Sequence, residues 1–206
     1  PIDFFQRIML SFISLSQSFD EKHFHNEPYL GLVGDHFTRP EIINKLPGKH
    51  SLGHVRYSTT GTKSSLKNVQ PLFADLSAGG IACAHNGNLT NGIDLRKRLV
   101  NKGAIFQSTT DTEAFIHLIS LSKEKNILNK IIDALFELEG AYSFGILTNK
   151  KLIGIRDPLG IRPLVLGDLN GSKILASETC ALDIIGAKYV RDIQNGEIVI
   201  ITEKGI

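Results

Sequence analysis

The sequence of 206 residues contains only two cysteines, Cys83 and Cys180, and no tryptophan. Two isolated cysteines form neither a disulfide framework nor a zinc site, and such sparing use is typical of a reducing compartment. No uninterrupted apolar run approaches the roughly 18 residues of a membrane-spanning helix, so no contact with a membrane is expected. These absences favour a cytoplasmic protein without structural disulfides.

An excess of charge of one sign is also missing. The formal net charge is +2, and no five successive residues carry like charges, which argues against a nucleic-acid partner. Hydrophobic residues make up 42% of the chain, enough for a sizeable core. No metal site is expected, because six histidines form no H-E-x-x-H zinc motif: these are His23, His25, His36, His50, His54 and His117.

Short runs of β-type residues recur along the chain and are bounded by Gly, Pro or Asn. The sequences TNKK at 148–151 and LNGS at 169–172 predict hairpin turns, and therefore antiparallel neighbours. The predicted strands are 52–57, 80–85, 104–107, 141–148, 151–157, 163–167, 173–177 and 197–202.

Helical periodicity interrupts these strands. Apolar residues at i, i+3, i+4, i+7 and i+8 from Phe5 predict a helix near the start of the chain, followed by a polar loop over 16–29. Thr110 and Glu113 have the spacing of a capping box. Groups of strands separated by a group of helices favour an α+β fold. The three central helices are predicted at 92–102, 111–123 and 127–139.

The stretch HVRYSTTG at 54–61 places an arginine at a strand end, before three hydroxyl residues. The guanidinium of Arg56 can grip a carboxylate with two parallel hydrogen bonds, and Ser58, Thr59 and Thr60 can add donors. The stretch by itself equally fits a surface salt bridge.

The stretch AHNGNLTN at 84–91 offers two neighbouring donors. The Asn86 side-chain amide and the Gly87 backbone N–H could together stabilise a developing oxyanion. Alternatively, Asn-Gly makes an ordinary hairpin turn, and His85 is a structural histidine. Asp111, in the first turn of a predicted helix, either caps that helix or binds an ammonium group of a ligand.

The stretch RDPLGIRPLVLG at 156–167 has the prolines and glycine of a rigid turn, and a scaffold role is expected for it. Cys83 lies within a predicted strand, and Cys180 lies at a predicted helix start in SETCALD. Both are predicted to be buried structural thiols.

Eight stretches in this order resemble the glutaminase half of the amidophosphoribosyltransferases, which begin purine synthesis. The resemblance implies an N-terminal-nucleophile hydrolase fold, an αββα sandwich of two mainly antiparallel sheets between helical layers. It implies a type 2 glutamine amidotransferase domain over 23–206, within a transferase of the glycosyltransferase class. The stretches are GLVGDHFTRPEIINKLPG, GHVRYSTTG, NVQPLF, AHNGNLTN, GAIFQSTTDTEAF, GAYSF, RDPLGIRPLVLG and ASETCALD.

The resemblance also implies roles for residues around glutamine. Arg56, helped by Thr59, would hold the α-carboxylate, Asp111 would hold the α-ammonium group, and Tyr57 would shape the pocket wall. In the same family the two donors of the oxyanion hole are an Asn-Gly pair, which corresponds here to Asn86 and Gly87.

The nucleophile of the family is an N-terminal cysteine whose own α-amino group acts as the base. This sequence starts PIDFFQRIML and has no cysteine before Cys83, and its residues 1–22 do not match the family. The chain as written is therefore expected to show negligible glutaminase activity. The alternatives are a pseudo-glutaminase that binds glutamine or glutamate, and a truncated non-functional remnant.

No stretch resembles the family's phosphoribosyltransferase domain. We therefore expect no cofactor in this chain, and Mg²⁺ with phosphoribosyl pyrophosphate only in that separate domain. Two cysteines are too few for the iron–sulfur cluster of some members. The expected partners are glutamine, a phosphoribosyltransferase domain and, in the full enzyme, further copies of the chain.

Overall fold

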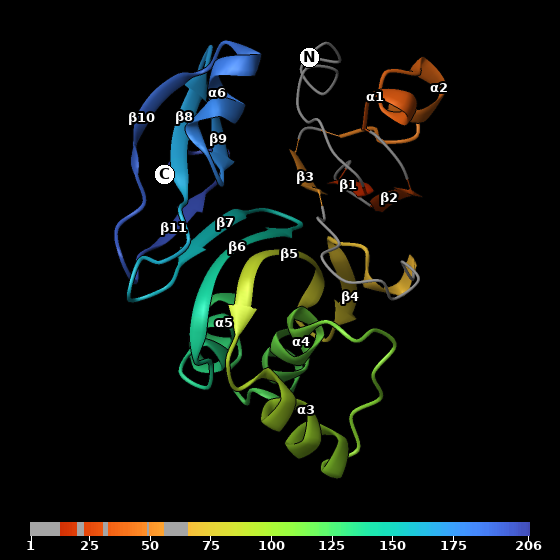
Figure 1. Cartoon of the computed structure of the whole chain (residues 1–206), viewed down its shortest axis with the longest axis vertical. Helices are drawn as coiled ribbons and strands as arrows, with labels where there is room; N and C mark the ends of the chain where they lie inside the picture. The colour runs from red at the N-terminus through yellow and green to blue at the C-terminus, as the bar shows by residue number, and fades with distance from the viewer. Residues whose placement is uncertain (1–12, 20–22, 31–32, 49, 56–65) are drawn as a thin grey trace.

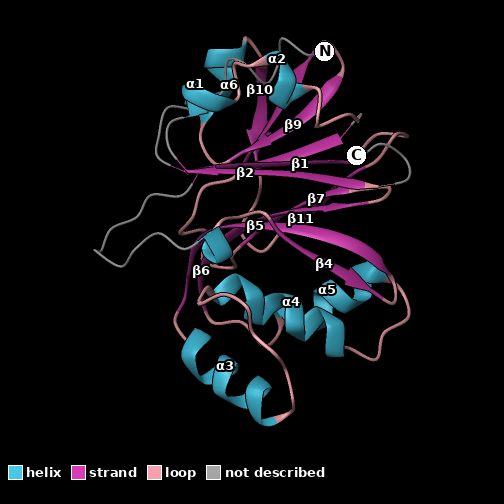
Figure 2. Cartoon of the chain, turned by 90° about the vertical axis from the view of Figure 1, so that its right-hand side faces the viewer, coloured by secondary structure: helices cyan, strands magenta, loops and turns pink. Residues whose placement is uncertain are grey.

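The computed structural model describes residues 13–19, 23–30, 33–48, 50–55 and 66–206. Two layers of β-sheet lie between layers of helices (Figure 1, Figure 2). The paired strands of every sheet run antiparallel. This confirms the predicted αββα sandwich.

The larger sheet has five strands in the order β11-β7-β6-β5-β4. Its centre is the long pairing of β5 with β6, which runs from Ile81 opposite Thr148 to Leu89 opposite Gly140. The hairpin predicted at 148–151 joins β6 to β7. The strands are β4 (Leu72–Leu76), β5 (Gly79–Leu89), β6 (Gly140–Thr148), β7 (Leu152–Arg156) and β11 (Ile198–Ile201).

The second layer consists of two three-stranded sheets, β2-β1-β3 and β10-β8-β9. Both pack on the same face of the larger sheet: Leu52 lies against Gly145, and Leu175 lies against Gly154. Their strands are β1 (Ile13–Phe19), β2 (Phe24–Leu30), β3 (His50–Val55), β8 (Val165–Leu169), β9 (Ser172–Ala176) and β10 (Lys188–Asp192).

Helices α3 (Gly92–Asn101), α4 (Asp111–Leu121) and α5 (Ile127–Leu135) lie on the opposite side of the larger sheet (Figure 2). Apolar residues of α4 and α5 form the main core with β5 and β6. The outer side of the second layer carries α1 (Val33–His36), α2 (Pro40–Ile43) and α6 (Thr179–Ile185), and the short 3₁₀ helix η2 is Leu66–Asn68.

Several sequence predictions about local structure are wrong. Residues 104–107 form no strand, and the predicted polar loop over 16–29 contains most of β1 and most of β2. The Asn-Gly pair does not turn the chain, because β5 continues to Leu89 in register with β6. Strands β4 and β10 were not predicted. The helix predicted from Phe5 lies mostly outside the described residues, and Ile13 at its end begins β1.

The capping box predicted for α4 is also wrong. Thr110 makes no side-chain cap, and the Glu113 carboxylate instead accepts hydrogen bonds from the backbone N–H groups of Gln107 and Ser108, both at 2.7 Å. Glu113 therefore braces the loop that enters α4, in place of the predicted strand. Because Asp111 is the first residue of α4, this brace also sets where its carboxylate lies.

Candidate functional site

Asn86 and Gly87 lie near the end of β5. Asn86 is opposite Ser143 of β6, and Ser143 is opposite Arg156 of β7. Directly opposed residues of antiparallel strands share a face of the sheet. Ser143 shares its face with Gly145, which meets Leu52 of β3. Asn86 therefore points toward the space between the two sheet layers.

Gly87 cannot be replaced by a larger residue without moving the sheet. Its φ is +150°, and a Cβ there would lie 2.1 Å from the carbonyl oxygen of Ala141. Glycine is the residue that tolerates both this conformation and this approach. The Gly87 backbone is exposed, so it can face a ligand. The structure therefore explains why the residue after Asn86 is a glycine.

The side-chain carbonyl oxygen Oδ1 of Asn86 accepts a hydrogen bond from the guanidinium Nη2 of Arg162. Arg162 lies in the loop between β7 and β8, 76 residues away. The sequence prediction gave this loop only a scaffold role. The signal that could have found Arg162 was the second arginine of RDPLGIRPL, because the prolines and glycine of this stretch hold it in a rigid turn.

Asp111 begins α4 and is tied to β5. Its Oδ2 accepts a hydrogen bond from the backbone N–H of Leu89 at 2.8 Å, and its Oδ1 lies 3.3 Å from His85 Nδ1. Burial by itself raises the pKa of Asp111, but hydrogen bonds from His85, Leu89 and Thr112 and the charge of His85 outweigh it and lower the pKa. The carboxylate is therefore ionised at neutral pH, and its side chain is still 23% exposed.

His85 connects the strand to this carboxylate. Its ring is buried and stacks on Phe144 at a centroid distance of 4.5 Å. Nδ1 lies 3.3 Å from both Asp111 Oδ1 and Thr112 Oγ1. Among the described residues, Nε2 has no hydrogen-bond partner. The predicted structural role of His85 thus includes holding Asp111.

The segment 56–65, which contains Arg56, Tyr57 and Thr59, lies outside the described residues, so the structure does not test these three assignments. Both flanks of the segment contact the site. His54 Nε2 donates to the carbonyl oxygen of His85 at 3.1 Å. Asn68 accepts from the backbone N–H of Thr109 at 2.9 Å, two residues before Asp111.

The two cysteines differ in their surroundings. Cys83 is buried within β5, and burial raises the pKa of its thiol far above the ordinary value. Cys180 is exposed, so the prediction of a buried thiol is wrong there. A hydrogen bond to Glu178 raises the pKa of Cys180. Both thiols are thus poor nucleophiles at neutral pH, because the thiolate is the reactive form.

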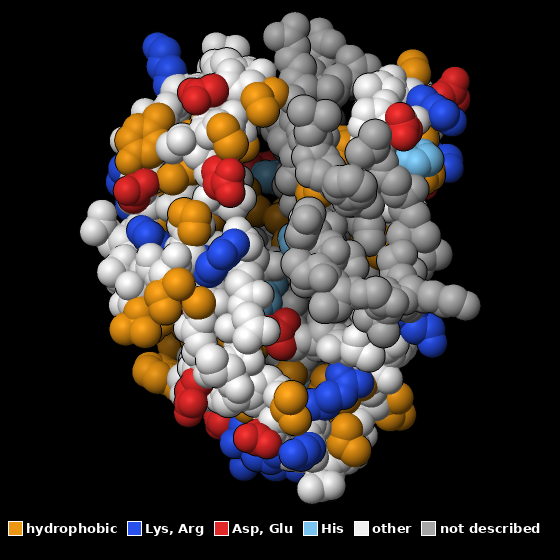
Figure 3. All heavy atoms as spheres, viewed as in Figure 1, with side chains coloured by type: hydrophobic (Ala, Val, Ile, Leu, Met, Phe, Trp, Pro, Cys, Tyr) orange, Lys and Arg blue, Asp and Glu red, His pale blue; other side chains and the backbone are white. Residues whose placement is uncertain are grey.

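In the described ranges no three His, Cys, Asp or Glu side chains are grouped so as to hold a metal ion. Nor does any helix in these ranges have the length and apolarity needed to cross a membrane. On the face shown in Figure 3, basic and acidic side chains are interspersed.

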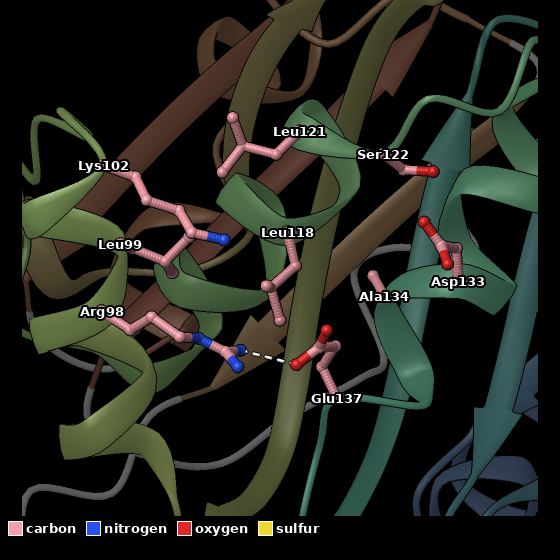
Figure 4. A pocket seen from close by; sticks show the side chains of 9 residues that line it. All are labelled: Arg98, Leu99, Lys102, Leu118, Leu121, Ser122, Asp133, Ala134 and Glu137. Carbon is pink, nitrogen blue, oxygen red and sulfur yellow. Dashed lines mark hydrogen bonds and ion pairs between the residues drawn. The ribbon is translucent and has the colours of Figure 1, made fainter.

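A small hollow lies between α3, α4 and α5, on the helical side of the larger sheet (Figure 4). Its volume is about 140 Å³, and Arg98 and Glu137 form an ion pair of 2.6 Å across it. Ligand pockets usually enclose about 300–1,000 Å³. None of the predicted site residues lines the hollow, so it is separate from the site around Asn86 and Asp111.

A family profile described as a glutamine amidotransferase domain matches residues 54–183. An amidophosphoribosyltransferase of Rhizobium etli is 56% identical over 183 residues, which cover 89% of this chain and 37% of the relative. The chain thus spans little more than a third of the length of that curated relative.

Two solved structures are similar in sequence and fold. A glutamine phosphoribosylpyrophosphate amidotransferase from B. subtilis, in complex with ADP and GMP, matches with a TM-score of 0.87 and 38% identity over 94% of this chain and 41% of its own. A structure described as the allosteric regulatory enzyme of purine biosynthesis matches with a TM-score of 0.89 and 38% identity, over 99% of this chain and 43% of its own. These matches confirm the N-terminal-nucleophile hydrolase fold.

Proposed function

The chain belongs to the glutamine amidotransferase family, in the branch of the amidophosphoribosyltransferases, and on this premise we propose that it is a glutamine-hydrolysing domain. Its product ammonia would pass to a phosphoribosyltransferase domain. The complete reaction converts glutamine, phosphoribosyl pyrophosphate and water into phosphoribosylamine, glutamate and pyrophosphate. We place the full enzyme in the cytoplasm, as a homo-oligomer.

The observation that carries the proposal is the arrangement at the end of β5. The ionised carboxylate of Asp111 accepts hydrogen bonds from the His85 ring and from the backbone N–H groups of Leu89 and Thr112. Two donors, the Asn86 amide and the Gly87 backbone, lie within three residues of Leu89 on the same strand. An anion and a pair of donors suit the ammonium group and the side-chain carbonyl of glutamine.

In the proposed reaction a thiolate attacks the side-chain carbonyl carbon of glutamine. The carbonyl oxygen becomes an oxyanion, which Asn86 and Gly87 stabilise by hydrogen bonds, and ammonia leaves. Oxyanion donors of this kind typically contribute about 3–4 kcal/mol to lowering the barrier. Arg56, with Thr59, holds the α-carboxylate of the substrate, Asp111 holds its ammonium group, and Tyr57 forms part of the wall.

The described residues do not supply a nucleophile for this reaction. Cys83 lies mid-strand with a raised thiol pKa, and Cys180 is on α6, with no site residue among its described partners. We therefore propose that the 206-residue chain binds glutamine and does not turn it over. Without a nucleophile most of the rate is lost, even where the binding groups remain.

Calorimetry with L-glutamine tests binding, and an assay for glutamate release tests turnover. Asp111→Asn should weaken glutamine binding about tenfold or more, because a charge-assisted contact is lost. Asp133→Asn is the matched control, since Asp133 is exposed on α5. The binding proposal fails if millimolar glutamine gives no heat. The turnover proposal fails if glutamate is released and an alkylating glutamine analogue stops the release.

A further inference from the structure

The contact between Arg162 and Asn86 joins the loop after β7 to the strand of the proposed oxyanion donors. Arg162 Nη2 donates to Asn86 Oδ1, and both side chains are half-buried. The contact is not needed to keep Asn86 in the sheet, because the backbone of Asn86 is already paired with Ser143 of β6. The contact instead determines which way the side-chain amide of Asn86 is oriented.

An asparagine side chain carries an acceptor, Oδ1, on one prong and a donor, Nδ2, on the other. Rotation of the amide by 180° exchanges the two, and either orientation fits the same space. A guanidinium has only donors, so the prong that faces Arg162 must be oxygen. The Nδ2 donor of Asn86 is then directed away from Arg162.

Arg162 is itself held by hydrogen bonds at both its backbone N–H and its backbone carbonyl oxygen. Its backbone N–H donates to Asp157 Oδ2 at 3.0 Å, and its carbonyl oxygen accepts from Arg156 Nε at 2.9 Å. The guanidinium of Arg156 also donates to the carbonyl oxygens of Gly160 and Ile193. The loop therefore presents Arg162 in one position, as a positioning group requires.

A second feature of Arg162 is the surroundings of its charged guanidinium. Within the described ranges Arg162 makes no ion pair with a carboxylate, and its buried Nε has no hydrogen-bond partner. A cation that donates to Oδ1 polarises the amide and strengthens Nδ2 as a donor. The effect acts on the same atom that would face a developing oxyanion.

We propose that Arg162 is a positioning residue that orients and polarises the Asn86 amide, so that Nδ2 faces the side-chain carbonyl of the substrate. The inference rests on the proposed function, since it assigns Nδ2 to the glutamine carbonyl. It gives the RDPLGIRPL loop a role in the reaction beyond that of a scaffold. Arg162 does not touch the reacting atoms and acts only through Asn86.

The first test measures the contact without any ligand. The Asn86 side-chain amide gives a pair of proton–nitrogen NMR resonances, which the spectrum of Asn86→Ala identifies by their loss. Arg162→Met should move this pair by more than its line width, and Arg162→Lys, which keeps the charge and a donor, should move it less. The control is Arg98→Met, which removes the ion pair between Arg98 of α3 and Glu137. It should leave the two Asn86 resonances unmoved.

The second test measures the consequence with two ligands. Glutamine has the side-chain carbonyl, whereas norvaline keeps the α-carboxylate and α-ammonium groups and lacks it. Arg162→Met should weaken glutamine binding about five- to tenfold, the size of one good hydrogen bond, and should leave norvaline binding unchanged. Arg162→Lys should restore part of the loss.

The outcomes separate this inference from the proposed function. If the Asn86 resonances do not move in Arg162→Met, or if Asn86→Ala weakens glutamine binding and Arg162→Met does not, the role of Arg162 is wrong and the proposed function stands. If glutamine does not bind to the unaltered chain, the proposed function fails, and the assignment of Nδ2 to a glutamine carbonyl fails with it. Equal losses for glutamine and norvaline in the folded Arg162→Met variant would also overturn the role.

Discussion

Replacement of Asp157 by asparagine should destabilise the protein more than any isosteric change at the surface. Asp157 is fully buried, and its carboxylate accepts four backbone hydrogen bonds. Oδ1 accepts from Leu159 at 3.0 Å and from Ile161 at 3.1 Å, and Oδ2 accepts from Arg162 at 3.0 Å and from Tyr142 at 3.3 Å. The carboxylate thus closes the loop after β7 onto β6.

Asparagine keeps one oxygen and places an NH₂ group against two of these four N–H donors. Each buried donor left without an acceptor costs about 1–3 kcal/mol, so we expect Asp157→Asn to lower the free energy of unfolding by about 3 kcal/mol. For a chain of this size that loss lowers the Tm by about 6–12 °C. Urea denaturation at pH 7 measures the first quantity, and calorimetric melting measures the second.

The pH dependence gives an independent check. Burial raises the pKa of Asp157, but the four backbone hydrogen bonds outweigh it and hold the pKa below its usual value. A carboxyl with a lowered folded pKa stabilises the fold fully above its unfolded pKa, about 3.9. That stability is lost as the pH falls through the folded value. The difference between the unaltered chain and Asp157→Asn should therefore be constant above about pH 5 and shrink below pH 4.

Asp133→Asn is the control for this experiment, because Asp133 is exposed on α5. It should change the free energy of unfolding by no more than about 0.5 kcal/mol. If Asp157→Asn falls within the same range, the carboxylate does not hold the loop. The account of how Arg162 is kept in place would then be refuted as well.

Three further results are expected. Gly87→Ala should disrupt the pairing of β5 with β6, because its Cβ would meet the carbonyl oxygen of Ala141, and the loss in urea denaturation should be about 2 kcal/mol or more; a stable variant would contradict the packing at this point. A thiol reagent should modify only Cys180 in the folded chain and should reach Cys83 only after unfolding. The reaction of Cys180 should be faster at higher pH, because the pKa of its thiol is raised. Reaction of both cysteines in the native state would show that β5 is open. Glutamine binding should weaken as the pH falls through the lowered pKa of Asp111, which titration calorimetry can follow, and a flat profile would exclude Asp111 as the anion that binds the ammonium group.

Local signals in the sequence predicted much of the fold because they act within a few residues. The helices around 92–102 and 111–123 and the hairpins at 148–151 and 169–172 all occur where expected. The last turn has Asn170 at a φ of 52° and Gly171 at 91°, the conformations that favour these two residues. The family resemblance, carried by eight motifs in order, predicted the sandwich and the site residues.

The same local signals failed where a distant partner decides the conformation. Asn-Gly favours a turn, yet Asn86 and Gly87 remain within β5 because β6 pairs with that strand from Ile81 to Leu89. The polar run from Ser16 to Tyr29 becomes strands because β1 pairs on both of its edges, with β2 and with β3. Backbone hydrogen bonds across a sheet outweigh the preferences of single residues.

The sequence by itself determined which chemical groups are present: an Asn-Gly pair, an aspartate at a helix start, and a loop with two arginines and an aspartate. Only the tertiary structure decided how they act together. It brought Arg162 to Asn86 across 76 residues, placed His85 beside Asp111, and exposed Cys180 instead of burying it. The physical reason is that sequence patterns report periodicity and turn chemistry over a few residues. The orientation of an amide and the charge of a carboxylate depend instead on atoms that only the packed sheets bring within hydrogen-bonding distance.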